Sequence, residues 1–106
     1  MVWSLIIEPG TRHVVNFKNN RGRLLHISKA TLDLSSTAGM LKDEHISLMM
    51  NYEKQPSTKG VILCNLNEQN NQQDLDLNVD GRLIVTLYSS NNKATIHVSG
   101  YFKRFM

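Results

Sequence analysis

Apolar and polar residues alternate along most of this chain, and this period of two limits its fold more than any other feature. Between residues 46 and 52, Ile46, Leu48 and Met50 occupy every second position, and the same pattern recurs in residues 83–88 and 94–101. Because successive side chains of a β-strand point to opposite faces, this alternation indicates half-buried strands. We therefore expect an all-β protein.

Turn-forming residues divide the alternating runs into short segments. The breakers are Pro9-Gly10, residues 19–22, Ala38-Gly39, Pro56-Ser57, Asp80-Gly81 and Asn91-Asn92. Strands are predicted near residues 2–7, 13–17, 24–34, 45–52, 60–66, 74–79, 82–88 and 94–102. Eight short strands separated by regular turn signals predict a two-sheet jelly-roll sandwich or barrel.

Two local signals refine this prediction. The apolar phase changes between Ile27 and Ala30, as an extra residue in a β-bulge would cause. The pairs Asp80-Gly81 and Asn91-Asn92 accept positive φ angles and suit tight hairpin turns. We therefore expect a bulge in the third strand and hairpins at both pairs.

Two segments are less regular. Residues 36–50 could form a helix capped by Ser36 or Thr37, but Gly39 and the alternation from residue 45 favour a loop followed by a strand. Residues 65–73 are rich in Asn and Gln and have no apolar member after Leu66, which predicts a long solvated loop.

Length and composition predict a single domain over residues 1–106, in a reducing compartment. Cys64 is the only cysteine, so no intrachain disulfide can form, and no Asn-x-Ser/Thr glycosylation site is present. No apolar run approaches the ~20 residues of a membrane span, so we expect no membrane partner. The net charge is +3. Residues 1–29 are mainly basic, whereas residues 64–80 carry four acidic side chains and no Lys or Arg.

The sequence contains no recognisable catalytic arrangement. Cys64 lies in an apolar run, where a thiol usually serves as a small buried side chain. The four histidines, at positions 13, 26, 45 and 97, fall in separate segments without the spacing of a metal site. Asp74 and Asp76 share one strand face but have no accompanying nucleophile. We expect no enzymatic activity, no metal and no cofactor.

Several sequence segments, taken in their order along the chain, resemble those of a known family. They are Trp3 with residues 6–10, Leu25 to Leu32, Leu63 to Leu66, Asp74 to Leu77, and Val98 to Tyr101. Across about residues 2–102 the chain resembles the nucleoplasmin-like domain, most of all the one at the amino terminus of nuclear FKBP-type prolyl isomerases and plant HD-type histone deacetylases.

The resemblance implies an eight-stranded jelly roll that assembles into a ring-shaped homopentamer, and in some members a decamer. It also implies histone-chaperone activity in the nucleus. Core histones are then the expected partners, and Glu68, Asp74, Asp76 and Asp80 are the candidate contacts. It further implies that this core belongs to a longer protein with acidic tails and, in some members, a prolyl isomerase domain. Histone binding in the family depends mainly on such tails, and Lys103-Arg104 is basic where acid would begin, so we expect this chain alone to bind histones poorly.

Two further expectations come from the residues themselves. The chain has more aromatic residues on its strands and at its end than one thin core needs, and we expect at least two of them at an interface between copies. They are Trp3, Tyr52, Tyr88, Tyr101, Phe102 and Phe105. The alternative function is a basic β-barrel that binds nucleic acid through Arg12, Lys18, Arg21 and Arg23, for which Phe17 is the only neighbouring aromatic.

Overall fold

The computed structural model describes residues 2–15, 23–41, 43–52, 60–80 and 84–104. Its elements are β1 (Val2–Ile7), β2 (Arg12–Val14), β3 (Arg23–Leu32), the 3₁₀-helix η1 (Leu34–Gly39), β4 (Ile46–Tyr52), β5 (Val61–Leu66), β6 (Gln72–Asp80), β7 (Val85–Ser89) and β8 (Ile96–Arg104). Within these residues no helix has the length and apolar character needed to cross a membrane.

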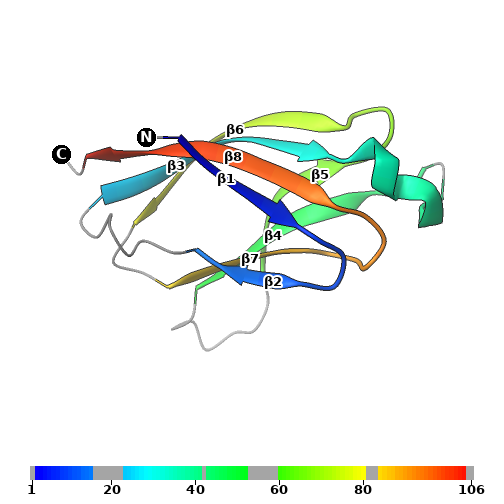
Figure 1. Ribbon diagram of the computed structural model, residues 1–106, viewed down its shortest axis with the longest axis horizontal. Coiled ribbons are helices and arrows are strands. Elements are labelled where there is room, and N and C mark those ends of the chain that lie inside the picture. The colour runs from blue at the N-terminus through cyan, green and yellow to red at the C-terminus, as the bar shows by residue number, and fades with distance from the viewer. Residues whose placement is uncertain (1, 16–22, 42, 53–59, 81–83, 105–106) are drawn as a thin grey trace.

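The eight strands form two four-stranded antiparallel sheets that pack face to face (Figure 1). Sheet A has the order β1-β8-β3-β6, and sheet B has the order β2-β7-β4-β5. Of the consecutive strands, only β4 and β5 are paired neighbours, because the chain otherwise crosses between sheets. This alternation is the jelly-roll arrangement, and the predicted fold class is confirmed.

The core lies between the sheets and follows the sequence alternation. In β4 and β8 the buried apolar residues occupy every second position, among them Ile46, Leu48, Ile96 and Val98. The alternate residues of the same strands point outward, so each sheet presents an outer face to its surroundings.

The predicted bulge in β3 is confirmed. The register of β3 shifts between Ile27 and Lys29 against both of its neighbours, β6 and β8. Leu25 and Ile27 are buried before the shift, and Ala30 and Leu32 are buried after it. The extra residue therefore returns the apolar side chains of the second half of β3 to the core.

Gly100 lies opposite Ile27, at the point where β8 meets this bulge. A Cβ atom at position 100 would overlap the carbonyl oxygen of His26, which is backbone and has no side-chain freedom to move aside. The absence of a side chain therefore permits the close approach of β8 to β3.

The two predicted hairpins are wrong. The strands flanking Asp80-Gly81 lie in different sheets, and Gly81 itself lies outside the described residues. Asn91-Asn92 also connects the two sheets, and both asparagines have negative φ angles. Instead, the Asn91 side chain accepts a 3.0 Å hydrogen bond from the Lys93 backbone N–H, which closes a local Asx turn.

The Asn/Gln-rich loop is shorter than predicted, because β6 begins at Gln72. Gln72 and Gln73 pair with Thr31 and Ala30 of β3, and this pairing outweighs the polar character of the glutamines. The connection closes at Asn67, whose side-chain oxygen accepts a 2.6 Å hydrogen bond from the Asn70 backbone N–H.

The helix considered over residues 36–50 is not present, because β4 occupies the second half of that segment. The preceding loop contains η1, and its cap is Asp33 instead of Ser36 or Thr37. The Asp33 carboxylate accepts hydrogen bonds from the Ser35 backbone N–H at 3.0 Å and the Ser35 hydroxyl at 2.6 Å. These bonds end β3 at Leu32, two residues earlier than predicted.

We predict that Gly100→Ala destabilises the domain by about 3 kcal/mol, because a Cβ at this position overlaps backbone in a packed sheet. Gly39→Ala is the matched control, since a Cβ there has no neighbour within 4 Å, and its effect should stay within about 0.5 kcal/mol. Urea denaturation measures both. Equal stability of the two variants would contradict the assigned register.

A second prediction concerns acid. The pKa of Asp33 lies below its ordinary value of 3.8, first because the Ser35 side chain donates a hydrogen bond to the carboxylate and next because His97 does. Stability from this group is present above pH 3.8 and is lost as the pH falls through the lowered pKa, because the unfolded chain binds the proton first. Asp33→Asn keeps a capping side chain but removes the titration, so its stability should fall less between pH 5 and 3 than that of the wild type.

The control for this experiment is Asp43→Asn, since Asp43 is an exposed carboxylate in the same connection. It should lose stability in acid as steeply as the wild type. If both variants show the same slope against pH in thermal melts, Asp33 does not contribute in this way.

Candidate functional surface

The four acidic candidates are distributed along one edge of sheet A. Glu68 lies in the turn between β5 and β6, and Asp74, Asp76 and Asp80 lie on β6, which is the outermost strand of that sheet. At about 3.4 Å per residue, Asp74 and Asp80 are about 20 Å apart along the strand. The structure thus brings Asp74 and Asp76 together on one face and leaves Glu68 and Asp80 at opposite ends of β6.

The alternation of β6 positions these carboxylates. Leu75 and Leu77 pack against the core, which turns Asp74 and Asp76 to the outer face. The side chain of Asp76 is 94% exposed, and Asp74 is also exposed. Asp80 is half-buried at the end of the strand. Exposed carboxylates of this kind can meet the cationic side chains of a partner at a small desolvation cost, but salt screens the attraction.

His26, which the sequence did not suggest as a binding residue, lies beside these carboxylates. The Nε2 atom of His26 is 3.6 Å from an Asp76 oxygen, and its Nδ1 atom is 2.9 Å from the Asn78 side-chain oxygen. The ring of His26 also contacts that of Tyr101, with 5.0 Å between centroids. One row therefore crosses the outer face of sheet A, from Tyr101 on β8 through His26 on β3 to β6.

Apolar side chains occupy the opposite part of the same face. Val2 and Ile6 of β1 are 85% and 51% exposed, and Val2 lies in register with Tyr101, which is 43% exposed. The outer face of sheet A is thus apolar along β1 and acidic along β6.

The outer face of sheet B carries a second row, which begins with Arg12 on β2 and is apolar on the other three strands. Arg12, Tyr88, Met49 and Ile62 lie in register across its four strands. Ile62 is 58% exposed, and Val14 on the same face is 63% exposed. The Arg12 guanidinium lies over the Tyr88 ring, with Cζ 4.1 Å from the ring centroid.

The predicted aromatic surplus is divided between core and surface. Phe102 is buried, and Trp3 packs against the core from the inner side of β1. Tyr101 and Tyr88 are on the outer faces of sheets A and B. The side chain of Tyr52 and all of Phe105 lie outside the described residues.

Cys64 and the remaining histidines are not placed for catalysis or for metal binding. Cys64 is buried on β5, and burial raises the pKa of its thiol, which disfavours the thiolate nucleophile. The other three histidines lie in different segments and have different hydrogen-bond partners, which are Thr11 for His13, Asn67 for His45 and Asp33 for His97. Among the described residues no three His, Cys, Asp or Glu side chains are grouped as metal ligands would be.

Comparison with known proteins gives a family match over almost the entire chain. The nucleoplasmin-like domain family matches residues 2–103. No curated protein matches the sequence significantly.

Among the solved structures that share the fold are two Drosophila domains. The nucleoplasmin-like N-terminal domain of Drosophila FKBP39 has a TM-score of 0.69 and 22% identity, with 100% of this chain and 90% of that chain covered. The Drosophila NLP core, described in terms of pentamer formation and histone binding, has a TM-score of 0.75 and 12% identity, with 97% and 98% covered.

The nucleoplasmin-like domain is a non-catalytic fold, in agreement with the expectation that this chain is not an enzyme. The fold and the sequence agree on the family, since the two sheets with their crossing connections accompany a family match over residues 2–103. The chain belongs to the nucleoplasmin-like domain family.

Proposed function

We propose that this chain is the oligomerising core of a nuclear histone chaperone, and that it forms a ring, most simply a homopentamer. In a longer protein the ring would present acidic tails and any C-terminal prolyl isomerase domain. Family membership supports a chaperone-type core, and the Drosophila NLP core is described in terms of pentamer formation and histone binding.

The observation that carries this proposal is the presence of exposed apolar side chains on both outer faces. Ile6 is 51% exposed on sheet A, and Ile62 is 58% exposed on sheet B. A closed ring is built from a head-to-tail contact, which needs two different patches on each subunit. The outer faces are on opposite sides of the sandwich, so each copy could contact one neighbour through sheet A and the other through sheet B.

The side chains at these patches suit a protein interface. Tyr101 lies beside Val2 on sheet A, and Tyr88 lies beside Met49 on sheet B. Aromatic residues and Met are enriched at the desolvated centres of interfaces. In the ring that we propose, the β1–β8 side of one copy packs on the β7–β4–β5 side of the next.

We expect Ile6→Asp and Ile62→Asp each to dissociate the ring, because either one places a charge in an apolar contact. Leu41→Asp is the matched control, since Leu41 is 72% exposed and lies in the connection after η1. Light scattering should give the Leu41 variant a mass near five times 12.1 kDa and the two face variants a smaller mass. A monomeric wild-type chain would overturn the ring, whereas intact rings in both face variants would overturn the choice of faces.

For histone contact we propose the acidic edge formed by Glu68, Asp74, Asp76 and Asp80. Asp74 and Asp76 share an outer face, and their exposure leaves them accessible to Lys and Arg of a basic partner. The edge is short, Lys29 lies in register with Asp74, and the net charge of the chain is +3. The core alone should therefore bind histones weakly and mainly at low salt.

The test replaces Asp74 and Asp76 together by Asn. This double variant should bind core histones several-fold more weakly at low salt, because each exposed charge contributes modestly. Asp43→Asn, on the connection after η1, should bind as the wild type does. If Asp43→Asn weakens binding as much as the double variant, binding depends on net charge and not on the acidic edge.

The nucleic-acid alternative has less support. Arg12 is on sheet B and stacks on Tyr88, whereas Arg23 begins a strand of sheet A. These two cations therefore do not share a sheet face. Phe17, Lys18 and Arg21 lie outside the described residues.

A further inference from the structure

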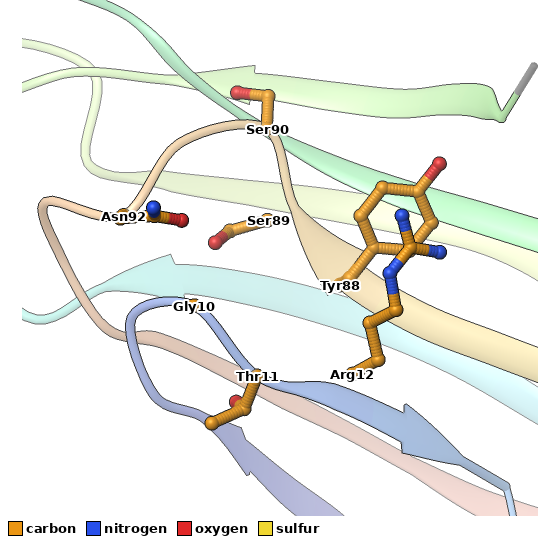
Figure 2. A pocket seen from close by; sticks show the side chains of 7 residues that line it. All are labelled: Gly10, Thr11, Arg12, Tyr88, Ser89, Ser90 and Asn92. Carbon is orange, nitrogen blue, oxygen red and sulfur yellow. The ribbon is translucent and has the colours of Figure 1, made fainter.

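A hollow of about 240 Å³ opens where the β1–β2 turn meets the β7–β8 connection (Figure 2). Gly10, with a φ angle of +75°, makes the turn on one side, and Asn92 lies opposite, within van der Waals reach of a Cβ at that position. The lining residues are Gly10, Thr11, Arg12, Tyr88, Ser89, Ser90 and Asn92. The hollow lies apart from the acidic edge, on the other side of the sandwich from β6.

Among the described residues that line the hollow, Arg12 alone has a charged side chain. One face of the guanidinium is covered by the Tyr88 ring, with the centroid 4.1 Å from Cζ, so its N–H groups remain available at the edge. No carboxylate among the described residues forms an ion pair with Arg12. Glu8 is the nearest acidic residue in sequence, and its contact in this turn is made by the backbone, whose carbonyl accepts a 2.7 Å hydrogen bond from the Thr11 hydroxyl.

The surface under Arg12 is itself fixed. The Tyr88 hydroxyl reaches across to β4 and donates to the Asn51 side-chain oxygen at 3.5 Å. Gly60, just before β5, leaves the room that this hydroxyl occupies, because a Cβ there would overlap it. Tyr88 on β7 is thus fixed by Asn51 of β4 and by the space at Gly60, and the stacked guanidinium is positioned before any ligand arrives.

The other groups in the hollow supply hydrogen-bond donors. The Ser90 oxygen accepts from the Ser47 backbone N–H at 2.8 Å, which leaves its own proton free to donate. The Asn92 side-chain amide has no hydrogen-bond partner among the described residues. The hydroxyls of Ser89 and Thr11, in contrast, already donate to backbone carbonyls. A cation and unused donors around one opening favour an anionic ligand.

We propose that this hollow binds the carboxylate of an Asp or Glu side chain from an acidic peptide. One unpaired guanidinium matches the single charge of a carboxylate, and its planar fork matches the two oxygens. A phosphate dianion would need a second cation. Lys93, the lysine next to Asn92, is paired with Glu44 at 2.9 Å and is not available.

The experiment measures binding of a fluorescein-labelled hexaglutamate peptide by fluorescence polarisation at constant low salt. Arg12→Gln should weaken binding about tenfold, the loss typical of one charge-assisted hydrogen-bonded contact. Arg104→Gln is the control, because it removes the same charge from an exposed position at the far end of β8. Tyr88→Leu keeps every charge but removes the surface under Arg12. Because Tyr88 also lies in the sheet B patch of the proposed ring, this variant is compared with the wild type at the same oligomeric state, measured by light scattering, and it should then weaken binding several-fold.

Three results would overturn the proposal. Equal losses in Arg12→Gln and Arg104→Gln would show that only net charge matters. Inorganic phosphate that displaces the peptide more effectively than acetate does would assign the hollow to phosphate. Peptide binding that appears only on dissociation of the oligomer would show that a neighbouring copy fills the hollow. Circular dichroism of each variant establishes that it is folded.

Discussion

The close contact of β8 with β3 at Gly100 is the constraint on which sheet A depends. Gly100 lies opposite Ile27, where the register of β3 shifts, and its missing side chain lets the two backbones meet. The shift then places Ala30 and Leu32 in the core after Leu25 and Ile27. Without it, the second half of β3 would turn its apolar side chains outward.

The thin two-layer sandwich has a direct consequence for assembly. Every strand residue points either to the shared core or to an outer face, so apolar residues beyond the capacity of the core appear at the surface. Here they are found on both faces, with Ile6 on one and Ile62 on the other. Two unlike apolar faces on opposite sides of one subunit are suited to a closed ring, in which each copy has two neighbours.

The sequence predicted the strands and the bulge because both follow from local alternation, which is visible at Ile27 and Ala30. The predicted hairpins failed because residue preferences at Asn91-Asn92 describe a turn but not which sheet the next strand joins. The pairing of Gln72 with Thr31 was likewise hidden, since it depends on a distant strand. The shared face of Asp74 and Asp76 could be predicted from their spacing in the sequence. The neighbours of His26 and Arg12 could not, because they depend on which strands pair and in which register.

Mixing two interface variants tests the head-to-tail arrangement most directly. An Ile62→Asp subunit keeps an intact sheet A face, and an Ile6→Asp subunit keeps an intact sheet B face, so one sound contact can form between them but no ring. Native mass spectrometry of the mixture should show mixed dimers near twice 12.1 kDa that neither variant forms alone. The absence of mixed dimers under conditions in which the wild-type chain forms rings would contradict the account.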